Sequence, residues 1–129
     1  MKIVLAIDDT PERYFGLSLL LGEGHLVVCL QTVTGAEMVL ASGKVCAVFL
    51  DHDMPSVKNG AITEEYSGQY FAREVLAQRS IPVAITSANP DGAEKISSIL
   101  EEYAVPWELL PVTERDHLKK WVNFIARSI

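Results

Sequence analysis

Short runs of β-branched and apolar residues alternate along this chain with longer segments of helical periodicity, and this alternation constrains the fold more than any other feature. It is typical of crossover units that build a parallel sheet with helices on both faces. The pattern predicts strands at 2–7, 25–30, 45–50, 82–86 and 107–110. It predicts helices at about 11–21, 34–42, 68–79, 91–103 and 113–127. We therefore expect an α/β fold, a three-layer doubly wound parallel sheet of about five strands.

Two predicted helix starts and one long connection stand out from this pattern. Thr10 and Asn89 each precede a proline, which places a capping side chain before a proline at the first helical position. The stretch 54–67 has neither strong periodicity nor a long apolar run, although it follows the most apolar strand. We expect an irregular insertion loop there, and loops of this length in compact domains are often functional.

Length and charge narrow the classes of partner. The 129 residues suit one domain, so we expect residues 1–129 to share a single core. Acidic residues number 17 against 11 Lys and Arg, and the net charge of −6 without a basic cluster argues against duplex nucleic acid. No apolar run approaches the roughly 20 residues of a bilayer span, and the first residues lack a signal-peptide cleavage site. We expect a cytoplasmic protein with no membrane partner.

Polar residues follow the first, third and fourth predicted strands: Asp8 and Asp9, then Asp51, His52 and Asp53, then Thr86, Ser87 and Asn89. In a doubly wound sheet of order 2-1-3-4-5 these strands are neighbours, and their ends meet where ligands bind. Carboxylates so close repel each other, by on the order of 4 kcal/mol per pair at about 4 Å and an effective dielectric near 20. A cation such as Mg²⁺, or Mn²⁺, relieves that repulsion. The predicted metal ligands are Asp8, Asp9, Asp51 and Asp53; alternatively, these aspartates only cap helices and end strands.

The other polar residues at these strand ends each have two interpretations. His52 suits a general acid or base because its pKa lies near neutrality, or it is an ordinary loop histidine. Arg13 either binds phosphate through its planar guanidinium or lies solvated on the first helical turn. Thr86 and Ser87 are candidate donors to phosphate oxygens. Asn89 is a helix cap that we also place among the candidate substrate-binding residues.

These residues resemble the receiver domains of response regulators, which have the CheY-like fold. Asp8-Asp9 match the acidic pair of that family, Asp51 the phosphoacceptor, and Thr86-Ser87 the hydroxyl position. The resemblance spans the whole chain and implies a receiver-like sheet of strand order 2-1-3-4-5. One position differs: receivers carry a lysine at the end of the fifth strand, where this chain has Leu110.

The chain resembles more closely an offshoot of that superfamily, the cyclic-phosphate-processing receiver-like domains. They lack the lysine, and the triplet Asp51-His52-Asp53, the insertion at 54–67 and the segment 87–92 match their motifs. Arg13 matches a basic position after their acidic pair, whereas Thr86 departs from a histidine of that family. This resemblance implies metal-dependent hydrolysis of a cyclic phosphate of a nucleotide or RNA-processing product, with Asp51 and His52 catalytic.

Three functions therefore stay open. The first is a metal-dependent enzyme that acts on a small phosphorylated molecule. The second is a stand-alone receiver phosphorylated on Asp51, against which the missing lysine argues. The third is a pseudo-receiver that binds a protein partner without chemistry, and the intact acidic residues argue against it.

Overall fold

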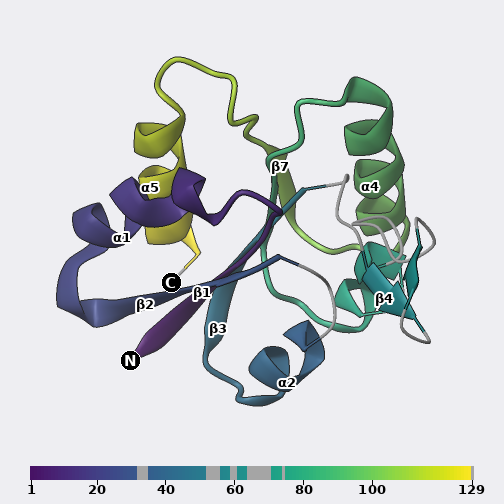
Figure 1. Ribbon diagram of the computed structural model, residues 1–129, viewed down its shortest axis with the longest axis horizontal. Coiled ribbons are helices and arrows are strands. Elements are labelled where there is room, and N and C mark those ends of the chain that lie inside the picture. Colours follow the sequence, from purple (N-terminus) through teal and green to yellow (C-terminus); the bar gives the residue numbers. More distant parts are fainter. Residues whose placement is uncertain (32–34, 52–55, 59–60, 64–70, 74, 129) are drawn as a thin grey trace.

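A five-stranded parallel sheet of order β2-β1-β3-β6-β7 forms the centre of the computed structural model (Figure 1). The structure describes residues 1–31, 35–51, 56–58, 61–63, 71–73 and 75–128. The strands are β1 Lys2–Ile7, β2 His25–Leu30, β3 Val45–Leu50, β6 Val83–Ile85 and β7 Trp107–Leu109. Numbered in chain order, these five strands have the predicted order 2-1-3-4-5. The predicted doubly wound α/β fold is confirmed.

Helices cover both faces of the sheet (Figure 1). One face carries α1 (Phe15–Leu21) and α5 (His117–Arg127), and the other carries α2 (Ala36–Ala41) and α4 (Pro90–Glu102). Short 3-10 turns occur at η1 Pro11–Tyr14, η2 Gly22–Gly24 and η4 Leu76–Gln78. The helix predicted at 68–79 is represented by helical residues 71–73 and by η4, and the rest of its first half lies outside the described residues.

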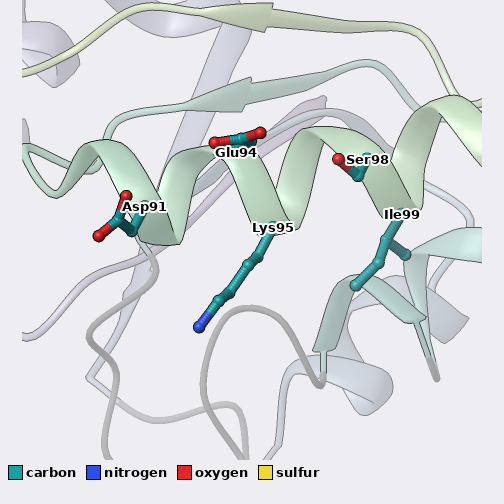
Figure 2. Close-up of a pocket in the computed structure, with 5 residues that line it drawn as sticks. All are labelled: Asp91, Glu94, Lys95, Ser98 and Ile99. Carbon is teal, nitrogen blue, oxygen red and sulfur yellow. The ribbon is translucent and has the colours of Figure 1, made fainter.

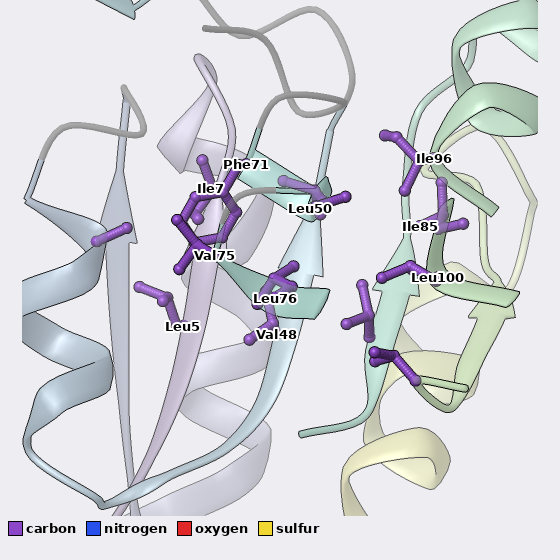
Figure 3. Close-up of a cluster of buried hydrophobic side chains, with 14 of the residues drawn as sticks. Leu5, Ile7, Val48, Leu50, Phe71, Val75, Leu76, Ile85, Ile96 and Leu100 are labelled. Carbon is purple, nitrogen blue, oxygen red and sulfur yellow. The ribbon is translucent and has the colours of Figure 1, made fainter. Parts of the chain in front are cut away.

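Each face of the sheet has its own apolar core, which explains why the central strands carry apolar residues on both faces. Leu5 and Ile7 of β1 point to the α2 and α4 side, where Ile96 and Leu100 of α4 complete the cluster (Figure 3). Each such side chain contributes roughly 1.5–3 kcal/mol when it is fully buried. The intervening residues of the same strands face α1 and α5, so the sheet is held from both sides.

The core under α1 and α5 is aromatic. Tyr14 stacks on Trp121 with ring centroids 4.9 Å apart, and Phe49 packs against both rings. The indole Nε1 of Trp121 donates to the carbonyl oxygen of Leu110 at 3.0 Å. This aromatic cluster (Tyr14, Phe49 and Trp121) reaches the carboxyl end of β1 through the Tyr14 hydroxyl, which donates to Asp8.

The prediction of an irregular loop at 54–67 was wrong within the described residues. Strands β4 (Ser56–Lys58) and β5 (Ala61–Thr63) pair antiparallel and form a separate two-stranded sheet. In the sequence, an Asn-Gly dipeptide separates these two short segments, and that dipeptide is a strong hairpin signal. Strands of three residues are too short to show a period, so this dipeptide is the main sign of them in the sequence.

Of the two predicted helix caps, one is confirmed and one is wrong. The Asn89 side chain accepts hydrogen bonds from the backbone N–H groups of Asp91 and Gly92, at 3.1 and 3.2 Å. Thr10 makes no such bond to η1; its hydroxyl instead donates to the Asp9 carboxylate at 3.2 Å. A nearby acceptor has therefore replaced the helix as its partner.

Within the described ranges, no helix is both long enough and apolar enough to cross a membrane.

Candidate functional site

The register of the sheet places one residue from each of four strands in a row at the carboxyl ends. The last paired positions of the neighbouring strands are Ile7, Leu50, Ile85 and Leu109. The residues that follow them form what we call the strand-end row: Asp8, Asp51, Thr86 and Leu110. The backbone N–H of each of the last three donates to the final carbonyl of the neighbouring strand, at 2.9 to 3.1 Å. These backbone hydrogen bonds therefore fix the positions of the Cα atoms from which the side chains extend.

Three carboxylates meet at one end of this row and form what we call the acidic cluster: Asp8, Asp9 and Asp51. One carboxylate oxygen from each lies within 4.8 Å of the others. The side chains of Asp8 and Asp51 are only 1% and 6% exposed, whereas Asp9 is exposed. The sequence predicted this proximity. Asp53 and the candidate acid His52 lie outside the described residues, so their roles stay predictions.

The Asp8 carboxylate accepts hydrogen bonds from three directions. The backbone N–H of Thr10 donates to Oδ1 at 2.9 Å, and the Tyr14 hydroxyl donates to Oδ2 at 3.2 Å. Nη1 of Arg13 lies 3.4 Å from Oδ1 and 3.3 Å from Oδ2. Asp8 is thus a buried carboxylate whose orientation is set by its neighbours.

The electrostatics of the acidic cluster favour a cation. Burial raises the pKa of Asp8 above its ordinary value and the Asp51 charge raises it further, against the opposing effects of Thr10, Arg13 and Tyr14. Burial also raises the pKa of Tyr14, so its hydroxyl stays protonated and donates to Asp8. The donors around Asp8 therefore do not fully compensate its negative charge.

We expect Asp8→Asn to stabilise the metal-free protein at neutral pH. Because the folded state raises the pKa of Asp8, protonated Asp8 favours folding at low pH, and that stability is lost as the pH rises through the folded pKa. Asparagine removes this loss. Melting temperatures measured in EDTA between about pH 4 and pH 7 should fall less steeply with rising pH in Asp8→Asn than in the wild type. Parallel curves for the two proteins would contradict the prediction.

The other predicted site residues take different positions around the acidic cluster. Arg13 lies at its rim with a 36% exposed side chain paired to Asp8. Thr86 is fully buried, and its hydroxyl lies 3.5 Å from that of Tyr14, so its observed partner is in the core. Ser87 is buried beside it and accepts a hydrogen bond from the backbone N–H of Asn89 at 3.1 Å. Their predicted roles toward phosphate stay predictions.

Sequence reasoning did not identify Tyr14 as part of the site. Its position in a helical segment of apolar periodicity marks it as a core residue, and its ring is indeed buried. That its hydroxyl reaches the Asp8 carboxylate depends on how η1 packs against β1. A tyrosine six residues after a strand-end aspartate was the only available signal, and it is weak.

A separate surface pocket of about 510 Å³ lies along α4 (Figure 2). Its lining residues are Asp91, Glu94, Lys95, Ser98 and Ile99. One basic side chain among two acidic ones gives it no strong preference for either sign of charge. Among the described residues, none of the predicted site residues lines this pocket.

The comparisons with known proteins concern the fold. No family model matches the chain, and no curated protein sequence matches it. Solved structures of receiver domains match nearly all of it. The BeF3-activated N-terminal receiver domain of Klebsiella pneumoniae RstA has a TM-score of 0.65 and 22% identity, over 98% of this chain and 99% of that one.

Two further structures agree with this likeness. The response regulator TrrA from Thermotoga maritima, in complex with Mg²⁺-BeF, has a TM-score of 0.64 and 24% identity, over 97% of this chain and 99% of that one. A CheY-like receiver domain protein from Methanospirillum hungatei has a TM-score of 0.67 and 14% identity, over 99% of this chain and 96% of that one. The chain thus has the CheY-like receiver fold. These structures do not support the closer resemblance to cyclic-phosphate-processing domains.

Proposed function

We propose that this chain is a receiver-like domain that binds Mg²⁺ through the acidic cluster and accepts a phosphoryl group on Asp51. The observation that carries the proposal is the convergence of three carboxylate oxygens within 4.8 Å of one another at the ends of neighbouring parallel strands. Two proteins of similar fold support it, since one is described as BeF3-activated and the other as a complex with Mg²⁺-BeF.

The donor set of the acidic cluster fits a small hard cation. All three side chains offer oxygen, and Mg²⁺ typically takes one or two protein carboxylates while it keeps waters and binds substrate phosphate. Mn²⁺ accepts the same ligands. When bound, such a cation neutralises charge that develops on the phosphoryl oxygens. Asp53 is retained as a proposed additional ligand.

The protein side chains supply the remaining requirements of phosphoryl transfer. One Asp51 oxygen attacks the phosphorus of a small phosphodonor such as acetyl phosphate, the bond to the leaving oxygen breaks, and acetate departs. Asp51 lies beside Asp8, whose own carboxylate is hydrogen-bonded by Thr10 and Tyr14. Arg13, which pairs with Asp8 and is partly exposed, is the proposed partner for an oxygen of the incoming phosphodonor.

A second candidate function, hydrolysis of a phosphate ester such as a cyclic phosphate, is favoured by Leu110. This apolar residue occupies the fourth position of the strand-end row, where receivers carry a lysine, and it packs against the aromatic cluster. A phosphoryl group on Asp51 therefore lacks a stabilising cation from that position, which favours turnover over storage. In this reaction water attacks phosphorus and loses a proton to solvent, one ester bond breaks, and the leaving oxygen takes a proton, for which His52 is the proposed donor.

One experiment separates these functions. We expect the purified chain with Mg²⁺ to release phosphate from acetyl phosphate and to show a transient phosphoryl adduct on Asp51 in rapid-quench mass spectrometry. Asp51→Asn should do neither, while Asp116→Asn, which alters an exposed aspartate outside the acidic cluster, should behave as the wild type.

The same samples receive a 2′,3′-cyclic mononucleotide in place of acetyl phosphate. Opening of this ring without an adduct from acetyl phosphate would replace the first function by the second. Inactivity toward both compounds would contradict both chemical functions and favour a protein-binding pseudo-receiver.

A further inference from the structure

We infer that Tyr14 is a positioning residue that holds the Asp8 carboxylate in an orientation suited to Mg²⁺ rather than to larger divalent cations. This inference rests on the proposed function, because it requires the acidic cluster to be a cation site. Tyr14 is buried in the core and is not among the residues predicted to bind substrate.

The Asp8 carboxylate is held at both of its oxygens. Thr10 donates from the backbone to Oδ1 at 2.9 Å, and Tyr14 donates from its hydroxyl to Oδ2 at 3.2 Å. Donors on the two oxygens resist rotation of the carboxylate plane. Arg13 contacts both oxygens as well, at 3.3 and 3.4 Å, but its partly exposed side chain constrains the orientation less.

The Tyr14 hydroxyl is itself fixed by the packing of its ring. The ring stacks on Trp121 at 4.9 Å with 15° between the planes, and it meets Phe49 edge-on at 6.0 Å. The Trp121 indole is anchored by its hydrogen bond to the carbonyl of Leu110. Phe49 lies on β3, two positions before Asp51 in the sequence, so the ring of Tyr14 packs on the strand that precedes this second carboxylate of the acidic cluster.

A fixed carboxylate matters more for Mg²⁺ than for Ca²⁺. Mg²⁺ demands near-ideal octahedral geometry at about 2.0–2.1 Å, whereas Ca²⁺ accepts roughly 6–8 oxygens at about 2.3–2.6 Å in variable arrangements. Partners that orient a metal ligand typically contribute about 10- to 100-fold in metal affinity. Loss of the Tyr14 hydroxyl should therefore weaken binding of the smaller ion more.

The test is isothermal titration of Tyr14→Phe with Mg²⁺ alone and with Ca²⁺ alone. This change removes one hydroxyl and keeps the stacked ring. We expect Mg²⁺ affinity to fall by about 10-fold and Ca²⁺ affinity to fall less, so that the ratio of the two affinities falls. Tyr103→Phe removes a hydroxyl from a half-exposed tyrosine at the end of α4 and should change neither affinity.

The affinity ratio distinguishes positioning from a general loss of structure, because a partly unfolded variant would lose both affinities in proportion. Unchanged Mg²⁺ affinity in Tyr14→Phe, or equal losses for both ions, would overturn the inference. If the wild type binds neither ion, the metal site itself is wrong, and the role of Tyr14 is rejected with it.

Discussion

Asp51→Asn should abolish the stabilisation that Mg²⁺ gives to the wild-type protein. A ligand that binds only the folded state at about 100 times its Kd adds about 2.7 kcal/mol to the free energy of unfolding. For a domain of this size that corresponds to a rise in melting temperature of roughly 10 °C. We expect the wild type to show this rise and Asp51→Asn to show almost none, because a central carboxylate of the acidic cluster is lost.

Without metal, Asp51→Asn should leave the melting temperature unchanged or raise it. The Asp51 charge raises the pKa of Asp8, which reports repulsion between two buried carboxylates. Asparagine removes that repulsion, so the metal-free variant should melt at the same temperature as the wild type or above it. This combination separates loss of a ligand from damage to the fold.

The measurement is a thermal melt of each protein in EDTA and in excess Mg²⁺. Asp9→Asn should also lose most of the Mg²⁺ response, while Asp116→Asn should keep it. Equal metal responses in the wild type, Asp9→Asn and Asp51→Asn would show that these carboxylates are not the ligands.

The sheet could be predicted from sequence because its central strands are buried on both faces. Val4, Leu5, Ala6 and Ile7 alternate between the two cores and are all fully buried, which produces an unbroken apolar run. A parallel sheet with crossover helices then has few allowed strand orders. The β4–β5 hairpin was missed because a three-residue strand has too few positions to show a period.

The acidic cluster was predictable for a related reason. A carboxylate that follows a central strand must lie at the carboxyl edge of the sheet, so Asp8 and Asp51 are brought together by strand order alone. The hydrogen bonds that shape the site depend on side-chain directions, which strand order leaves open. Thr86 illustrates this, because its hydroxyl lies against Tyr14 in the core although a role toward phosphate was predicted.

In the strand-end row, backbone hydrogen bonds rather than side chains determine where each residue lies. Its backbone hydrogen bonds are complete across all four strands, and they place Leu110 as regularly as they place Asp51. A lysine is therefore not needed to build this edge of the sheet. The side chain at the fourth position of the row can therefore be changed without loss of the backbone hydrogen bonds, and a substitution of Leu110 tests its effect on phosphoryl binding.

Leu110→Lys should strengthen the binding of beryllium fluoride, a mimic of the phosphoryl group, in the presence of Mg²⁺. A hydrogen bond to a charged group is worth about 1.5–3 kcal/mol, which corresponds to roughly a 10- to 150-fold gain in affinity. Leu110 lies in the same strand-end row as Asp51, and its backbone N–H donates to the carbonyl oxygen of Ile85. A lysine there can extend toward a group bound at Asp51.

The acidic cluster favours that direction for the new side chain, because its carboxylates attract an ammonium group. On the other side Leu110 lines a surface pocket with Lys120 and Arg127, which are already ion-paired with Glu114 and Glu108 and offer a new ammonium group no anionic partner. The Trp121 hydrogen bond should persist, because its acceptor is the backbone carbonyl of Leu110.

Leu110→Met provides the matched control, since it keeps a side chain of similar volume without the charge. Binding of beryllium fluoride is measured by titration at saturating Mg²⁺ for the wild type and both variants, and the lifetime of the acyl-phosphate on Asp51 is followed by rapid quench. We expect the lysine variant alone to bind more tightly and to hold the phosphoryl group longer. If the lysine and methionine variants behave alike, the fourth position of the row does not reach the phosphoryl group, and the leucine at that position does not explain rapid turnover.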